Sequence, residues 1–475
     1  MKAPLVVYFI ILVFNFDLFC QNKTVEASGQ VLDAKTMQPV PFASARFLQS
    51  SIGISCNENG YFRLFTPYYQ NDTLQISCIG YETVFISASN LNQKTIVLRP
   101  VVVSLNEVTI IKEIPIDEIL VKMLEALREK HISSPHQQWG FYKTSTNVAG
   151  KYVGFSENLC AIYNQGYNEN FSKDKYKYLS TDMSKNTETR ASNYSYSHNR
   201  NGYPGKGIEA LGLLTMKKNI IHGDLLSKNT NKYFDWTIQD KVYLKDEIIY
   251  ILAFSPKENY LKKRLKEPEV YSSIFRGIYA GRVFVNAKNG YVPTKIEIET
   301  APYTTLLKKI INKSTNYISE LKEELVTIQY ENFRGNYFLS RISYEQNYLD
   351  FGWSPNESPA QKVKISSELN ITTLNNKLIS NHDLSTIFGE YEQFDDIKLQ
   401  TEGDKYATYR PVFWGKYPID NILIEDLQTS NTPLETQFKA NSNRKMIDLN
   451  DCSTFIKFYT TKTREQLINQ LQAGN

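Results

Sequence analysis

The residues best suited to metal or acid–base chemistry in this chain are its five histidines, namely His131, His136, His198, His222 and His382. A catalytic zinc site needs closely spaced imidazole and carboxylate ligands, such as His-x-x-Glu. None of the five histidines is followed by Glu three residues later. The spacing therefore predicts no metal-ligating residue.

The arrangement closest to a catalytic pair is His222, Gly223 and Asp224. A glycine just past a helix, with a histidine at the negative helix end, is typical of a helix-ending turn. The sequence has no Gly-x-Ser-x-Gly elbow, and the stretch from Gly205 to Gly212 has neither dinucleotide-binding nor P-loop spacing. We therefore predict no catalytic residue, no cofactor-binding residue and no cofactor.

Clustered carboxylates and cysteines are the remaining candidates for a metal site or for disulfide chemistry. The carboxylates Glu390, Glu392, Asp395 and Asp396 could hold calcium, but they lack the alternation of a calcium loop, so a solvated acidic face is the favoured interpretation. Without Cys20, the chain has four cysteines: Cys56, Cys78, Cys160 and Cys452. Four cysteines are too few for a disulfide scaffold in a chain of this length.

The composition of the chain indicates the elements that must position these residues. A length of 475 residues favours two domains. With 54 basic and 50 acidic side chains, the net charge of +4 is too balanced for nucleic-acid binding, and no such partner is expected. The 32 tyrosines and 25 phenylalanines suit half-buried strands. We expect a β-rich protein.

The first residues predict export. Residues 1–20 have one cation at Lys2 and an apolar run from Leu5 to Phe14, which reaches about half of the ~20 residues that a spanning helix requires. We expect a cleaved signal peptide and no transmembrane helix in the mature chain. Lipidation of Cys20 is the alternative, although the bulky Phe19 precedes it where a lipoprotein signal has a small residue.

Residues 24–100 alternate with the period of two that a strand with one buried face requires. About seven short strands at regular spacing, with a tight turn at Asn59-Gly60, predict a Greek-key β-sandwich. The alternation directs Cys56 and Cys78 inward. Free buried thiols are the favoured interpretation, and a disulfide requires that their strands be neighbours at the same height.

Four motifs of this segment resemble a known family: GQVLDA (29–34), PVPFASA (39–45), NENGYF (57–62) and IGYE (79–82). They are similar to the carboxypeptidase-regulatory-like domain. The resemblance implies a transthyretin-like sandwich of the kind common at the N-terminus of exported outer-membrane proteins of Gram-negative bacteria. It implies no activity, because in zinc carboxypeptidases this sandwich is an accessory to the catalytic domain.

After a linker strand, the segment from Ile116 to Lys130 carries an apolar stripe at helical spacing, and we expect the following domain to cover it. Four hairpins then predict an antiparallel meander, a curved sheet or half-barrel, with turns at 149–150, 245–246, 289–290 and 335–336. We expect helices at 208–221 and 306–313, a polar surface excursion at 173–207, an irregular tract at 380–405 and a terminal amphipathic helix. From the first helix onward, the layout also resembles exported two-domain proteins in which this sandwich is followed by a half-barrel.

The predicted organisation is a signal peptide at 1–20, the sandwich at 24–100, a linker strand and helix at 101–135, the half-barrel-like domain at 136–430 and a C-terminal extension at 431–475. We expect a non-catalytic protein of the cell envelope, periplasmic, peripheral at the outer membrane or at the cell surface. The sandwich would be a docking or spacer module, and the half-barrel would bind an envelope or outer-membrane protein, a glycan or a lipid. A lipid or lipoprotein carrier and an unrecognised hydrolase are the alternatives.

Overall fold

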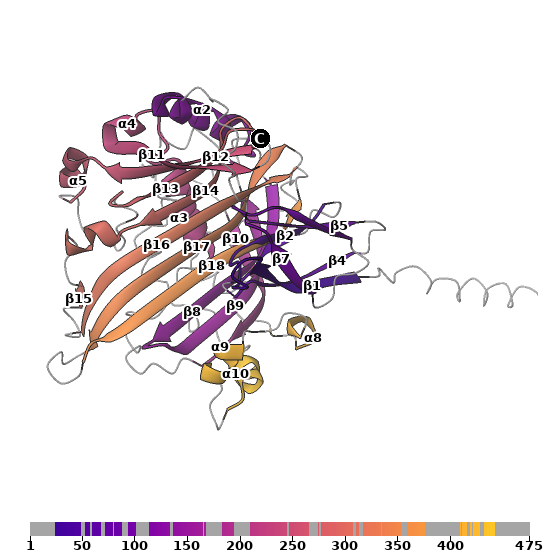
Figure 1. The fold of residues 1–475 in the computed structure, drawn as a ribbon. Coiled ribbons are helices and arrows are strands. Elements are labelled where there is room, and N and C mark those ends of the chain that lie inside the picture. Colours follow the sequence, from indigo (N-terminus) through magenta and orange to yellow (C-terminus); the bar gives the residue numbers. More distant parts are fainter. Residues whose placement is uncertain are drawn as a thin grey trace, which may run out of the picture. The chain divides into compact units, whose positions relative to one another are not determined.

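The computed structural model describes residues 24–48, 53–57, 59–67, 72–78, 80–87, 94–100, 114–133, 136–164, 166–167, 183–193, 210–244, 247–265, 274, 277–306, 310–312, 317–333, 335–352, 359–375, 409, 411–415, 419, 421–427 and 432–441. The chain divides into two compact units, residues 1–100 and residues 101–475. Both are mainly β, as the sequence predicts (Figure 1). The expected signal peptide, the acidic cluster at 390–396, the terminal helix, Cys20, Cys452, His198 and His382 lie outside the described residues.

The first unit is a sandwich of two small sheets. Its strands are β1 (Thr24–Asp33), β2 (Ser44–Phe47), β3 (Gly53–Ser55), β4 (Tyr61–Pro67), β5 (Thr73–Ser77), β6 (Val84–Ser87) and β7 (Lys94–Leu98). They form one sheet in the order β4-β1-β7 and another in the order β3-β2-β5-β6. The inward residues predicted by the alternation, such as Val31, Phe47 and Leu74, are fully buried. The predicted sandwich is therefore confirmed.

The turn before β4 shows why the Asn59-Gly60 step is needed. Gly60 has φ +74°, a conformation that costs glycine little, and a Cβ there would lie 2.5 Å from the carbonyl oxygen of Val31. The side-chain oxygen of Asn57 accepts the backbone N–H groups of Asn59 at 3.0 Å and of Tyr61 at 2.9 Å. The turn thus satisfies its own backbone donors.

Neither Cys56 nor Cys78 forms a disulfide in the structure. Cys56 donates its N–H to Ala43 at 2.7 Å, and β2 pairs with the strand before Cys56 on one side and with the strand before Cys78 on the other. The two cysteines therefore lie on opposite sides of β2, roughly 10 Å apart at ~4.8 Å per strand, beyond the ~7 Å limit for a disulfide. Burial raises the pKa of the fully buried Cys56 thiol, so the group behaves as a small apolar side chain.

The second unit is built on an open antiparallel sheet. Its strands are β8 (His136–Val148), β9 (Lys151–Asn164), β10 (Met183–Ala191), β11 (Phe234–Leu244), β12 (Glu247–Pro256), β13 (Ala280–Asn286), β14 (Val292–Glu299), β15 (Ile310–Asn312), β16 (Tyr317–Phe333), β17 (Asn336–Gly352) and β18 (Gln361–Asn375). The order is β10-β9-β8-β18-β17-β16-β14-β13-β12-β11, and β15 pairs with β16. The four predicted hairpins are present, and Gly150, Gly290 and Gly335 have the positive φ that their tight turns require.

Two helices bury their apolar side chains on one face of this sheet. Helix α2 (Ile116–Glu129) packs on β11 and β14, and α3 (Ala210–Ile221) packs on β10, β17 and β18. The stripe of α2 that includes Ile119, Met123 and Leu127 is fully buried in this core, so the domain that follows covers it, as predicted. Each such side chain contributes roughly 1.5–3 kcal/mol by burial.

Short helices complete the second unit: α4 (Thr230–Tyr233), α5 (Glu258–Arg264), the 3₁₀ helix η5 (Ala301–Leu306), α8 (Pro411–Trp414), α9 (Asn421–Leu427) and α10 (Leu434–Asn441). Helices α9 and α10 pack on Phe155 of β9, which lies on the sheet face opposite to Ile162 and the α2 and α3 core. Among the helices of the described chain, none combines the length and the apolar character needed to cross a membrane.

Two expectations for this unit were wrong. The predicted helix at 306–313 is a 3₁₀ turn followed by strand β15, because Ile310 and Ile311 pair with the start of β16 instead of forming a helical face. The polar excursion at 173–207 contains the edge strand β10, which pairs with β9. An edge strand needs only backbone hydrogen bonds to one neighbour, so its sequence shows little apolar alternation.

Candidate functional site

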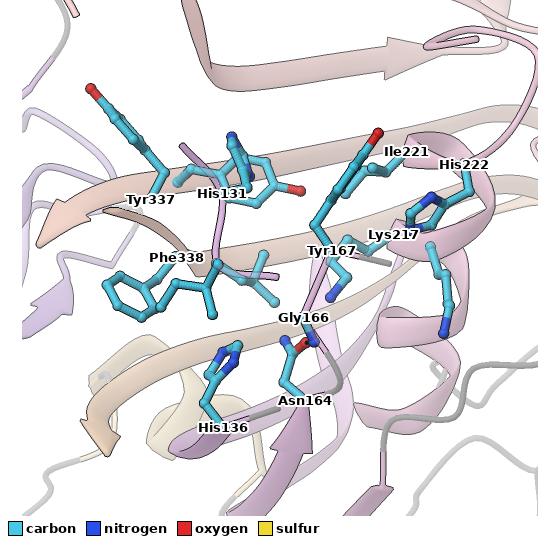
Figure 2. Close-up of a pocket in the computed structure, with 14 residues that line it drawn as sticks. His131, His136, Asn164, Gly166, Tyr167, Lys217, Ile221, His222, Tyr337 and Phe338 are labelled. Atoms are coloured by element: carbon cyan, nitrogen blue, oxygen red, sulfur yellow. Dashed lines mark hydrogen bonds between the residues drawn. The ribbon is translucent and has the colours of Figure 1, made fainter. Parts of the chain in front are cut away.

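A pocket opens in the second unit where two helices end beside the sheet. It lies between the end of α2, the last turn of α3, the outer ends of β8 and β9, and the hairpin of β16 and β17 (Figure 2). Its cavity volume is about 40 Å³, room for about three water molecules. A group of a few atoms therefore fits in it.

Backbone hydrogen bonds hold the walls of the pocket together. The N–H of Tyr337 donates to Lys130 at 2.8 Å, and the N–H of Ile132 donates to Tyr337 at 3.3 Å. The N–H of Tyr167 in turn donates to Ile132 at 2.6 Å. The segment after α2 is thus fixed between β17 and the segment that follows β9.

His131 is a buried histidine of the site and is packed between two tyrosines. Its side chain lies between the rings of Tyr330 and Tyr337, with centroids at 4.4 and 5.9 Å, and the residue is only 6% exposed. Burial lowers the pKa of His131 to about 3, and the positive charge of Lys217 lowers it further, against a hydrogen bond to the carbonyl of Pro293. His131 is therefore neutral near pH 7.

Two buried polar atoms in this wall lack a partner within the described residues. They are Nε2 of His131 and the hydroxyl oxygen of Tyr330. A neutral imidazole has one donor nitrogen and one acceptor nitrogen. Buried polar atoms without a hydrogen-bond partner cost free energy.

The opposite wall is cationic. Lys217 and Lys218, near the end of α3, line the pocket and are only 8% and 6% exposed. Figure 2 shows the Lys217 side chain reaching toward the segment of Asn164 and Tyr167. None of the described residues that line the pocket is acidic. Lysines at a helix C-terminus also stabilise the helix dipole, so part of their role is structural.

The other two described histidines line the same pocket. The ring of His222 lies 4.9 Å from that of Tyr167, and the ring of His136 lies 5.8 Å from that of Phe338, centroid to centroid. The predicted helix-ending turn is confirmed, since α3 ends at Ile221 and the N–H of His222 donates to Lys218 at 2.9 Å. The described residues contain no group of three His, Cys, Asp or Glu side chains arranged to hold a metal ion.

The sequence analysis assessed the histidines only by their spacing along the chain. His131 and His136 are five residues apart and His222 lies 86 residues after His136, and the tertiary fold brings all three to one pocket. Tyr330 and the two lysines were not identified as site residues. The basic run Lys217-Lys218 just before His222 was the one sequence signal available, and it fits any helix C-terminus equally well.

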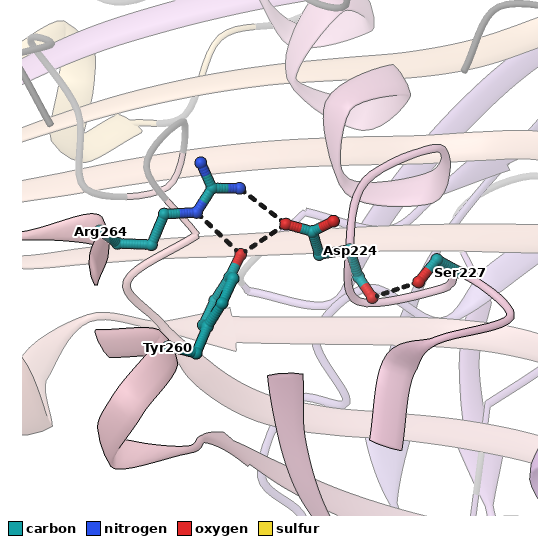
Figure 3. A network of polar contacts seen from close by, with 4 residues as sticks. All are labelled: Asp224, Ser227, Tyr260 and Arg264. Atoms are coloured by element: carbon teal, nitrogen blue, oxygen red, sulfur yellow. Dashed lines mark hydrogen bonds and ion pairs between the residues drawn. The ribbon is translucent and has the colours of Figure 1, made fainter. Parts of the chain in front are cut away.

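A second polar cluster joins the turn after α3 to α5 (Figure 3). Asp224 accepts the hydroxyl of Tyr260 at 2.9 Å and pairs with Arg264 at 2.7 Å, and Arg264 also donates to the Tyr260 hydroxyl at 3.0 Å. Burial raises the pKa of Tyr260, and the charge of Asp224 raises it further. Each of the three side chains hydrogen-bonds to the other two, so the cluster has a structural role and joins the turn after α3 to α5.

These features define a mainly β protein with an N-terminal sandwich and an open, helix-backed antiparallel sheet. Residues 27–110 match the family model of the CarboxypepD_reg-like domain. The resemblance stated for the first domain is therefore confirmed. A comparison with curated proteins finds no match to this chain.

Three solved structures are similar to part of the chain. A DUF1329 family protein from Desulfovibrio piger is 11% identical, with 58% of this chain and 95% of that chain covered and a TM-score of 0.21. A LolA superfamily protein from Nitrosomonas europaea is 12% identical, with 57% and 99% covered and a TM-score of 0.18. A lipovitellin structure titled for its lipid–protein interactions is 9% identical, with 52% and 26% covered and a TM-score of 0.20. Likenesses this weak do not bear on function.

Proposed function

We propose that this protein is an exported, non-catalytic binding protein of the Gram-negative cell envelope. Residues 24–100 serve as a docking or spacer module, and the sheet domain at 136–430, backed by the C-terminal extension, carries the ligand site. The observation that carries the proposal is the small pocket at the ends of α2 and α3, whose described lining includes two lysines and three histidines.

Binding fits this pocket better than acid–base catalysis. A general acid or base works best with a pKa near the operating pH, and burial holds the pKa of His131 at about 3. Its aromatic and backbone contacts also fix His131 in place. A fixed, neutral imidazole is suited to recognising a ligand atom.

The first unit supports a docking role through its surface. Large apolar side chains at least 39% exposed are concentrated there: Met37, Leu48, Tyr61, Phe85 and Val97. Aromatic residues such as Tyr61 and Phe85 are common at the centre of protein interfaces. In this proposal the partner of the sandwich is another envelope protein.

The pocket at the ends of α2 and α3 is not an acyl-chain cavity. A lipid carrier needs a large apolar cavity, whereas the pocket described here has a volume of about 40 Å³ and is lined by lysine, histidine and asparagine as well as by aromatic rings. This lining suits the polar end of a ligand.

The test is fractionation of the producing cell, followed by native mass spectrometry of the full chain purified under mild conditions. We expect the chain in the envelope fraction and a bound small-molecule mass that is lost on denaturation. A chain confined to the cytoplasm, or one whose native and denatured masses agree, contradicts the proposal. Mild crosslinking before lysis identifies the protein partner of the sandwich.

A further inference from the structure

We propose that the edge strand β6 of the sandwich pairs with β6 of a second copy of this chain, so that two small sheets join into one continuous sheet across a two-fold axis at Phe85. The inference rests on the docking role in the proposed function and deepens it, because it names one partner and the mode of contact. It does not depend on the pocket in the second unit.

Strand β6 ends its sheet, and its side chains are incompletely covered. It is the last strand in the order β3-β2-β5-β6, and among the described strands it pairs with β5 alone. Its core-facing residues, Val84 and Ile86, pack on the sandwich core but are only partly buried, whereas the β5 residues opposite them are fully buried. A further strand beside β6 would bury more of this apolar surface.

The edge also lacks the features that keep edge strands apart. Charged side chains, proline and bulges commonly prevent an exposed edge from pairing with another chain. Of the other edge strands in the sandwich, β4 carries Arg63 and ends at Pro67, and β7 begins with Lys94. Strand β6 has no charged residue and no proline, its pairing with β5 has no bulge, and its Phe85 is 61% exposed. The backbone groups along such an edge are suited to pairing with another extended strand.

The sequence around β6 indicates that this strand can be another β6. Residues 83–87 read Thr-Val-Phe-Ile-Ser, a polar, aliphatic, aromatic, aliphatic, polar pattern that is symmetric about Phe85. In an antiparallel pair, residues directly opposite each other lie on the same face of the sheet. A two-fold axis at Phe85 therefore places the two Phe85 rings side by side on the outer face. Val84 then lies opposite the partner's Ile86 on the core face, and Thr83 lies opposite the partner's Ser87.

Charge and size define the contact further. Residues 83–87 are uncharged, so no like charges meet across the axis, and aromatic and Thr–Ser pairs at opposite positions stabilise a sheet. One short strand from each copy buries much less than the ~1,600 Å² of a standard interface, so the contact by itself is weak and reversible. We therefore expect a dissociation constant of roughly 10–500 µM.

The test is sedimentation equilibrium of the full chain from about 5 µM to about 1 mM, a range that covers weak contacts. We expect the average mass to rise from that of one chain toward that of two and no further, because a two-fold contact closes on itself. A chain that stays monomeric throughout overturns the inference, and so does an open series of larger species.

Two lysine variants locate the contact. Phe85→Lys places two ammonium groups against each other at the axis and should weaken association by about tenfold or more. Tyr61→Lys is the matched control, since Tyr61 is an aromatic residue with a similar exposure of 54% on β4 of the other small sheet, and it should leave association unchanged. Equal effects of the two variants would place the contact elsewhere and contradict the inference.

A charge exchange tests the two-fold axis itself. Phe85→Lys and Phe85→Glu should each associate weakly alone and at least about tenfold more tightly when mixed in equal amounts, because opposite charges then meet at the axis. Phe85 is mostly exposed, so neither variant removes a core side chain. A mixture that associates no better than its components contradicts pairing at Phe85.

This inference and the proposed function can fail separately. A different envelope protein crosslinked to the sandwich of a chain that stays monomeric refutes the pairing of β6 with itself and leaves the docking role standing. A chain that dimerises through Phe85 but is confined to the cytoplasm refutes the proposed function and supports the pairing.

Discussion

His131 should make the second unit sensitive to mild acid. Its pKa is about 3 in the folded chain and about 6.5 in an unfolded one, so below pH 6.5 the unfolded state binds a proton that the native state does not. The contribution of His131 to stability is therefore fully present above pH 6.5 and is lost as the pH falls toward 3. Each pH unit inside this window costs up to about 1.4 kcal/mol.

From pH 7.5 to pH 5.0 the expected loss from this group is about 2 kcal/mol. Most carboxylates stay ionised over this interval, so their contribution is small. His131→Asn is the comparison, because the asparagine amide can still donate to the carbonyl of Pro293 but does not titrate. Between pH 7.5 and pH 5.0, this variant should therefore lose about 2 kcal/mol less of its free energy of unfolding than the wild type does.

Urea denaturation followed by tryptophan fluorescence measures this difference. All four tryptophans, Trp139, Trp236, Trp353 and Trp414, lie after residue 100, so the signal reports the second unit alone. Parallel pH slopes for the wild type and His131→Asn would refute the reasoning, because the histidine would then titrate alike in the folded and unfolded states.

Three further outcomes are expected. Met123→Ala should lower the free energy of unfolding of the second unit by about 2–5 kcal/mol, because Met123 is fully buried in the α2 core, whereas Val121→Ala at a 56% exposed position should change it by less than about 0.5 kcal/mol in the same fluorescence assay. Gly60→Ala should destabilise the sandwich by about 1–3 kcal/mol, because alanine is strained at the positive φ of this position and its Cβ would meet the nearby carbonyl. The expected result is faster hydrogen exchange in peptides of residues 24–100, with the unfolding reported by tryptophan fluorescence unchanged. Equal exchange in the variant and the wild type would count against a strained turn. Cys56 and Cys78 should both be alkylated in denaturant without reductant, and a mass two labels short would reveal a disulfide that the strand order does not allow.

The parts of the fold that sequence predicted well are those governed by local rules. Alternation of apolar residues followed the strands of both units, and glycine at the turns marked the hairpins, because side-chain parity and positive φ act over a few residues. The two wrong predictions, at residues 173–207 and 306–313, had a different cause. Strand β10 forms through backbone pairing with β9, and Ile310 and Ile311 pair with β16, so in both places pairing with another strand set the conformation.

The pocket, unlike the strands and turns, could not be predicted from local sequence patterns. Linear spacing dismissed His131, His136 and His222, yet the ends of two helices and of four strands place them around one cavity. The neutral state of His131 arises from burial between Tyr330 and Tyr337, which no local pattern records.

By itself the sequence determined the fold class, the sandwich family and the amphipathic face of α2, since periodicity and turn chemistry are properties of neighbouring residues. Only the tertiary structure decided that two lysines share a cavity with an unpaired imidazole nitrogen, and that Cys56 and Cys78 are separated by a strand. These are contacts between distant segments, and their energies depend on burial and distance, which exist only once the chain has packed.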